Sequence, residues 1–307
     1  MLSRTADSIY WIARYMERAE NVARLLDVTH RMSLLPGNDA RGYWGAALSA
    51  NGLDAAYQRK YGAFNGPNVV RYMVLDDDNP SSIRTCLRSA RENAHAVRGA
   101  ITSEFWETLN ATWLDMRSVK PGQLQGAALI ALFEWVKFRS HQARGVALGT
   151  MLRDEASCFS ALGSFLERAD NTARILDVKY DPLAPEPRPG NEYYEWGALL
   201  RSVSAFEIYR RVYRDVITPA RVAELLVLRK DMPRSLRACM AEVHNTLETI
   251  ANSQSAETGR RAGKLHAELH FGNIEHILEA GLHAMLTDFL ERTADLGARI
   301  SADFLIP

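Results

Sequence analysis

The sequence lacks most of the features that mark secreted, membrane-spanning or disulfide-rich proteins. It has only three cysteines, Cys86, Cys158 and Cys239, and their odd number and wide spacing indicate small buried residues, not a disulfide framework or a zinc site. The most apolar run, GAALIALFEWV at 126–136, contains a glutamate and is far shorter than the roughly 20 residues that cross a bilayer. Charged residues interrupt the N-terminal stretch, so we expect no signal peptide there. We therefore expect a cytoplasmic protein with no membrane partner.

An excess of one charge is also missing. Lysine and arginine total 37, and so do aspartate and glutamate, whereas a protein that binds the nucleic-acid backbone normally carries a basic excess. The sequence contains no glycine-rich phosphate loop, no serine nucleophile elbow and no cysteine–histidine pair in a recognisable context. We expect no nucleic-acid partner and no cofactor, and these patterns alone name no reaction.

Strand signals are scarce, whereas apolar residues recur at helical spacing along the whole chain. The sequence therefore predicts an all-α, multi-helix bundle of about ten helices. A proline-rich connector, DPLAPEPRPG, is expected at 181–190. The expected helices lie at about 5–31, 43–61, 68–75, 80–116 (bent near Gly99), 123–148, 154–179, 193–213, 219–228, 233–251, 257–270 and 274–304.

The first of these helices recurs about half a chain later. Residues 17–28, ERAENVARLLDV, return as ERADNTARILDV at 167–178, with a constant offset of 150 positions and no gap. Later segments also match, including Trp-Gly-Ala at 44–46 and 196–198. The sequence therefore predicts an internal duplication: one domain over 1–307, built of two related halves at about 1–150 and 151–307.

Polar residues form a narrow stripe on each repeated helix. At 100° per residue, Arg14, Asn21 and Arg24 lie within about 60° of Glu17. In the second copy, Asn171 and Arg174 flank Glu167 in the same way. Glu17 is too far from Arg24 along the axis for a direct contact, so each of these arginines is expected to pair locally with the aspartate three positions later, Asp27 or Asp177, or to bind something outside the helix.

Three interpretations of the stripes remain open from the residues alone. If the two helices pack antiparallel, Glu17 meets Arg174 and Glu167 meets Arg24 in a symmetric salt-bridge cluster. The stripes can instead be exposed faces. They can also form a site in which arginines and asparagines hold a carboxylate- or peptide-like ligand, and the two glutamates are candidates for a general acid and base.

Histidines near the C-terminal end suggest a metal site only superficially. His266 and His270 are spaced i, i+4, and Glu275, His276, Glu279 and His283 follow. Ala267 occupies the position at which metalloprotease motifs have glutamate, and Gly272 separates the two groups. We therefore predict no metal site.

The motif segments resemble the bacterial alpha-E family, α-helical proteins named for a Glu-Arg motif. The resemblance rests on MLSRTADSIYWIARYMERAENVARLLDV at the start, on ARENAHAVRGAITSEFWETLN, and on TMLRDEASCFSALGSFLERADNTARILDVKY. It places the family motif on Glu17-Arg18 and Glu167-Arg168. It also implies partners, because alpha-E proteins are encoded beside, or fused to, circularly permuted ATP-grasp proteins and often lie near transglutaminase-like proteins.

The function expected from this resemblance is that of an accessory protein. ATP-grasp enzymes commonly join a carboxylate to an amine, so the resemblance implies a non-catalytic binding or scaffold subunit of a peptide- or amide-bond-forming system. Two alternatives stay open: a stand-alone enzyme that uses Glu17 and Glu167 as acid and base, and a structural protein whose stripes are internal salt bridges. The candidate binding residues are Arg14, Glu17, Arg18, Asn21, Arg24, Glu167, Arg168, Asn171 and Arg174.

Overall fold

The computed structural model describes residues 1–35, 40–181 and 192–305, and in these parts its regular structure is entirely helical, without strands. The all-α expectation is confirmed. Most of the expected proline-rich connector, 182–190, lies outside the described residues. The α-helices are α1 (Ser3–Ser33), α2 (Ala40–Ser49), α3 (Asp54–Tyr61), α4 (Gly66–Val74), α5 (Ile83–Ala96), α6 (Ser103–Ser118), α7 (Gly126–Thr150), α8 (Glu155–Tyr180), α9 (Glu192–Ser202), α10 (Phe206–Tyr213), α11 (Pro219–Val227), α12 (Leu236–Thr249), α13 (Ala256–His270), α14 (Ile274–Ala280) and α15 (Leu282–Phe304), with one 3-10 turn at Pro121–Gln123.

The described parts contain fifteen α-helices, so the expectation of about ten was too low. Four of the expected helices are each broken in two by a turn. Gly52 (φ 65°), Ser204 (φ 55°) and Gly281 (φ 102°) lie in three of these breaks, and a positive φ cannot continue a right-handed helix. The fourth break, at 97–102, ends where the Thr102 side chain accepts a hydrogen bond from Phe105 N and starts α6.

Two helix starts also lie later than expected. Ser82, not Asn79, caps α5 by accepting a hydrogen bond from Thr85 N at 3.1 Å. Ser235 caps α12 in the same way, accepting from Ala238 N at 3.0 Å. The proline two positions before each serine therefore lies in the turn that precedes the helix and not in its first turn.

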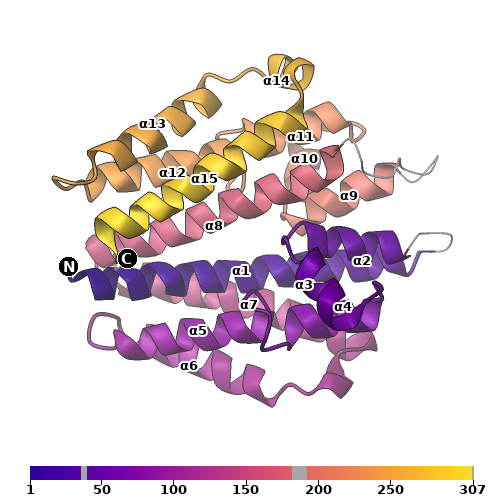
Figure 1. Cartoon of the computed structure of the whole chain (residues 1–307), viewed down its shortest axis with the longest axis horizontal. Coiled ribbons are helices and arrows are strands. Elements are labelled where there is room, and N and C mark those ends of the chain that lie inside the picture. The colour runs from indigo at the N-terminus through magenta and orange to yellow at the C-terminus, as the bar shows by residue number, and fades with distance from the viewer. Residues whose placement is uncertain (36–39, 182–191, 306–307) are drawn as a thin grey trace.

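The two repeated helices, α1 and α8, lie side by side at the centre of the molecule (Figure 1). Helices α5 and α7 pack on α1, and α6 packs on both of them. On the other side, α12 and α15 pack on α8, and α13 packs on both of those. The short helices α2–α4 and α9–α11 gather at one end (Figure 1). The repeated helices are therefore covered on several sides.

One apolar core spans both groups of helices. Helix α1 contributes side chains that are 1% exposed on different faces, among them Tyr10, Ile12 and Val22. A helix buried around most of its circumference has no wet side, so its polar stripe must be satisfied by other protein groups. In the parts of the chain that the structure describes, no helix is both long and apolar enough to cross a membrane.

Candidate functional site

Helices α1 and α8 run parallel and in register, so each residue of α1 lies near the residue about 150 positions later. Gly163 marks the closest approach: a Cβ there would collide with the backbone carbonyl oxygen of Tyr10 and would lie 3.2 Å from Ala13 Cβ. At the start of the pair, the Met1 ammonium group contacts the Glu155 carboxylate. The antiparallel arrangement, which was the condition of one of the three open interpretations, is therefore wrong.

The two Glu-Arg dipeptides exchange partners across this contact. Arg168 Nε and Nη2 lie 3.0 and 2.9 Å from Glu17 Oε1 and Oε2. Arg18 Nε and Nη2 lie 2.5 and 2.9 Å from Glu167 Oε1 and Oε2. Each is a two-point contact that matches the planar guanidinium to the planar carboxylate. The parallel register explains the exchange, because it puts each glutamate beside the arginine that follows its own counterpart.

The surroundings of the two glutamates differ. Glu167 receives a second arginine from α1: Arg14 Nε donates to Glu167 Oε2 at 2.7 Å. The Arg14 guanidinium also lies over the rings of Tyr10 and Trp11, 5.6 and 5.2 Å from their centres. The position of α8 that corresponds to Arg14 is Ser164, so α8 supplies no such group to Glu17.

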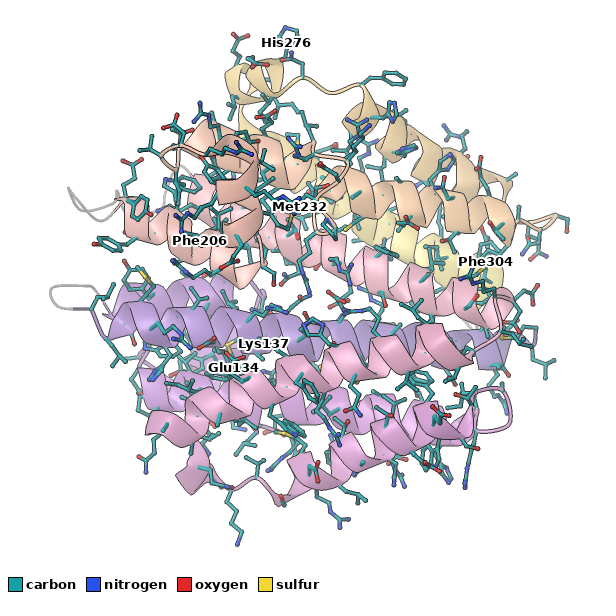
Figure 2. All side chains as sticks on the ribbon, turned by 180° about the vertical axis from the view of Figure 1, so that it is seen from behind. Glu134, Lys137, Phe206, Met232, His276 and Phe304 are labelled. Atoms are coloured by element: carbon teal, nitrogen blue, oxygen red, sulfur yellow. The ribbon has the colours of Figure 1, made fainter. Side chains whose placement is uncertain are left out.

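Glu17 is instead completed by arginines from outside the motif helices. Arg234, just before α12, donates from Nη1 to Glu17 Oε1 at 2.9 Å, and Arg144 of α7 donates from Nη2 to Glu17 Oε2 at 2.6 Å. Figure 2 shows the molecule from behind, with α7 crossing in front of α1 and its Glu134 and Lys137 labelled. Three guanidinium groups, from α7, α8 and the start of α12, therefore converge on one carboxylate.

A second carboxylate belongs to the same cluster. Glu20, which is 0% exposed, accepts from Arg234 Nη2 at 2.6 Å and from Arg144 Nη2 at 2.9 Å. It also accepts from Arg24 Nε at 2.9 Å and from the Ser140 hydroxyl at 2.8 Å. We call Glu17, Glu20, Arg24, Arg144, Arg168 and Arg234 the Glu17 cluster.

Ion pairing keeps these carboxylates ionised. Burial opposes their ionisation, but Arg234 and Arg168 outweigh it and lower the pKa of Glu17. Burial likewise opposes ionisation of Glu167, while Arg14 and Arg18 lower its pKa to about 2. Both motif glutamates are therefore hydrogen-bond acceptors without an exchangeable proton near neutral pH.

Comparison with known proteins finds a family that is described by the same Glu-Arg motif. The Alpha-E family, described as a predicted alpha-helical domain with a conserved ER motif, matches residues 1–305. This chain belongs to the Alpha-E family. Among its relatives are uncharacterized proteins of Mycobacterium bovis (strain ATCC BAA-935 / AF2122/97) and Mycobacterium tuberculosis (strain ATCC 25618 / H37Rv), each 25% identical over 309 residues. The match covers 94% of this chain but 35% of each relative, so the chain spans about a third of their length. No solved structure matches it.

The chain contains a third Glu-Arg dipeptide that takes no part in the contact between α1 and α8. Glu291-Arg292 lies on α15, where Glu291 is exposed. Arg292 Nη1 contacts Glu268 and Asp288 at 2.6 and 3.0 Å. The dipeptide joins the central cluster only where a parallel partner helix presents its own copy in register.

The pairings expected from the stripes were wrong in detail. Arg24 does not reach Glu167 or Asp27, and its carboxylate partner is Glu20, one turn earlier. Arg174 likewise pairs with Asp170, at 2.8 Å, and not with Glu17 or Asp177. Both observed pairs are i, i+4 contacts within one helix.

The two aspartates have other partners. Asp27 binds Arg31 and Lys137, at 2.9 and 3.1 Å. Asp177 Oδ1 lies 2.8 Å from His283 Nδ1 of α15. The residues of the predicted stripes therefore divide into two groups. Arg14, Glu17 and Glu167 join the α1–α8 contact, whereas Arg24 and Arg174 pair with acidic residues of their own helices.

The motif asparagines differ from each other. Asn21 Oδ1 accepts from Arg234 Nη1 at 2.9 Å, which attaches it to the Glu17 cluster. The Nδ2 atoms of Asn21 and Asn171 are buried without a hydrogen-bond partner. Of the nine predicted site residues, the structure brings Arg14, Glu17, Arg18, Glu167 and Arg168 directly together, with Asn21 and Arg24 attached through other groups.

Sequence reasoning missed five members of the central network: Glu20, Ser140, His141, Arg144 and Arg234. Glu20 lies about 60° from Glu17 on the same helical wheel, at the edge of the stripe opposite Arg14, and was left out of the predicted site. Arg234 occupies the place between proline and serine that Ser81 occupies in the first half. That difference at an otherwise matching segment is the one signal that marked Arg234.

Two of the C-terminal histidines, His266 and His270, form a group of ring contacts with His244. The His244 and His266 rings are 5.2 Å apart and the His266 and His270 rings 5.5 Å apart, between their centres. Within the described ranges, no three histidine, cysteine, aspartate or glutamate residues are placed to hold a metal ion.

Proposed function

We propose that this chain is a non-catalytic binding or scaffold protein of an ATP-grasp-linked system that forms peptide or amide bonds. The observation that supports the non-catalytic role is that each motif glutamate is bound by the motif arginine of the other central helix: Glu17 by Arg168, and Glu167 by Arg18. These glutamates fix the register of α1 and α8, a role for which buried polar pairs are well suited. We also infer that the two halves arose by duplication and that the protein works in the cytoplasm, where ATP is supplied.

The acid/base alternative fits the geometry less well. A general acid or base must exchange a proton near the working pH and must reach its substrate. Glu17 is 1% and Glu167 5% exposed, and arginine neighbours lower the pKa of both. An enzyme that used them would first have to break the contact between its own central helices.

The relatives support an accessory role through their length. They contain more than twice as much chain as the matched region, so in them the Alpha-E unit lies beside other sequence. A unit that works next to a second component, fused or separate, fits this arrangement. The circularly permuted ATP-grasp protein is the partner that we propose, with a transglutaminase-like protein as a further member of the system.

Co-purification tests this proposal directly. We expect the tagged chain to retain the circularly permuted ATP-grasp protein encoded beside it, and to change that protein's rate of ATP turnover. The control is the same chain after it has been unfolded and refolded without the partner. If the native fold carries the interaction, the refolded chain must again retain the ATP-grasp protein and change its rate of ATP turnover. No retention together with an unchanged rate would refute the proposal.

The structural alternative also has a specific observation in its favour, since the motif glutamates are internal. It predicts a different outcome of the same experiment: substitutions at the partly exposed arginines of α1 and α7 should leave association with the ATP-grasp protein unchanged. If these substitutions abolish association with the partner but leave the unfolding midpoint unchanged, the arginines bind the partner and the purely structural alternative is wrong.

A further inference from the structure

The charges of the Glu17 cluster do not balance. Its four arginines face two carboxylates, Glu17 and Glu20, which leaves an excess of two positive charges, four minus two. Arginine keeps its charge in proteins, so the excess cannot be removed by deprotonation. Burial, with Arg168 and Arg24 nearby, lowers the pKa of Arg234 in spite of the two glutamates. The cluster is therefore short of negative charge.

The neighbouring charges do not supply the deficit. One turn further along α1 and α7, Arg31 and Lys137 face Asp27 and Glu134, two charges of each sign. On α8, Arg174 is matched one to one by Asp170. Arg14 and Arg18 face Glu167 alone, which leaves a separate excess of one positive charge. Among these groups of described residues, the larger excess, of two, lies in the Glu17 cluster, where α7 meets α1.

The excess reaches solvent at one place. The side chains of Arg168 and Arg234 are 9% and 7% exposed, but that of Arg144 is 31% exposed. Beside it on α7, the side chain of His141 is 51% exposed. A ligand from solvent can therefore reach the Arg144 guanidinium without any opening of the α1–α8 contact.

His141 lies between two arginines that it cannot both satisfy. Arg24 Nη2 is 3.0 Å from His141 Nε2, and Arg144 Nη1 is 3.4 Å from His141 Nδ1. Burial and the nearby arginines lower the pKa of His141, so the ring is neutral at pH 7. A neutral imidazole has one acceptor nitrogen, and its other nitrogen is a donor. One guanidinium N–H therefore faces an imidazole N–H and gets no acceptor from His141.

We propose that Arg24, His141 and Arg144 form a binding site for an oxyanion, a carboxylate or a phosphate group of a ligand. An oxyanion has several lone pairs, accepts from both guanidinium groups and from the imidazole N–H, and offsets the excess charge. The site rests on the proposed function and sharpens it: it names the acidic end of the substrate or partner that the accessory protein holds.

Anion titration of the purified chain tests the site without any partner. Inorganic phosphate and acetate are titrated separately by calorimetry at constant ionic strength, with chloride as the exchanged ion, and the His141 ring resonances are followed by NMR. We expect saturable one-to-one binding of at least one anion, with a shift of the His141 signals. Binding of phosphate alone assigns a phosphate group, and binding of acetate alone assigns a carboxylate. The absence of saturable binding of either anion overturns the proposal.

Two variants locate the binding. Arg144→Gln removes the exposed guanidinium, and His141→Ala removes the imidazole without touching a carboxylate partner of Arg24 or Arg144. Each should weaken anion binding about tenfold, the effect of one lost charge-assisted hydrogen bond. Arg174→Gln is the matched control, because Arg174 holds the place of Arg24 on α8 but has its own aspartate, and it should bind as the wild type does. Unchanged binding in His141→Ala, with its fold intact by circular dichroism, contradicts the site.

The two proposals can fail separately. If the anions bind but the ATP-grasp protein is not retained, the site stands and the partner is wrong. If the partner is retained but neither anion binds, the partner stands and the oxyanion site is wrong.

Discussion

Glu17 and Glu20, three residues apart on α1, share two guanidinium groups: Arg144 Nη2 donates to both carboxylates at 2.6 and 2.9 Å, and Arg234 contacts them at 2.9 and 2.6 Å. Two buried carboxylates this close would repel each other without the shared cations. The same sharing ties α7 and the start of α12 to α1. The cluster thus connects helices that pack on opposite sides of the central pair.

Removal of one motif carboxylate should strongly destabilise the fold. Glu17→Gln would leave Arg168 and Arg234 buried beside Glu20 alone, and breaking a buried ion pair in this way typically costs about 3–5 kcal/mol. Glu167→Gln should lower the free energy of unfolding less than Glu17→Gln does. The two arginines that it leaves unpaired, Arg14 and Arg18, have side chains that are 16% and 23% exposed and can contact water. The free energy of unfolding in urea measures both values.

The third Glu-Arg dipeptide provides the control for this comparison. Glu291→Gln changes an exposed residue and should alter the free energy of unfolding by no more than about 0.5 kcal/mol. Equal losses at Glu17, Glu167 and Glu291 would contradict a role that depends on the parallel α1–α8 contact.

Stability should fall in acid because of Glu167. Its pKa is lowered from an ordinary 4.5 to about 2, so its contribution is complete above pH 4.5 and is lost as the pH falls toward 2. At 1.36 kcal/mol per unit, the loss amounts to about 3 kcal/mol. Urea unfolding at pH 7, 4.5 and 2.5 should show this decline. The difference between wild type and Glu167→Gln should shrink over the same range, and a difference independent of pH would count against the assignment.

The sequence predicted the elements of this fold better than their pairing. The helical spacing of apolar residues is a local property, so the all-α class and the outlines of α1 and α8 could be predicted. The turns at Gly52 and Gly281 were not, because a single glycine within a helical pattern is often tolerated. Whether two repeated helices pack parallel or antiparallel depends on the whole chain, and the stripe residues fit both arrangements.

The candidate site could be predicted only in part for the same reason. Glu17 and Glu167 stood out because they recur, and recurrence follows from the sequence alone. Arg144 and Arg234 do not recur, and they reach Glu17 across 127 and 217 positions. Only the packing of α7 and α12 brings them to the cluster, so no helical wheel of α1 could include them.

The three thiols should differ sharply in reactivity. Cys86 and Cys239 are 0% exposed, and burial raises the pKa of each to about 12, which removes the reactive thiolate at pH 8. Cys158 is partly exposed. A disulfide reagent at pH 8 should therefore label one thiol in the native protein and all three in denaturant. Cys158→Ser should abolish the native reaction, and rapid native labelling of that variant would contradict the buried positions of the other two.

A side chain at Gly163 should destabilise the protein. Its missing Cβ is what lets α8 approach the Tyr10 carbonyl, so Gly163→Ala must push α1 and α8 apart and strain the ion pairs one turn further on. Overpacking of this kind typically costs about 1–3 kcal/mol. Gly145→Ala is the matched control, because Gly145 also lies within a helix but has nothing within 4 Å of the added atom, and it should stabilise the protein by up to about 1 kcal/mol through helix propensity. Urea unfolding of the two variants should thus give shifts of opposite sign, and a stabilising Gly163→Ala would refute the close parallel contact.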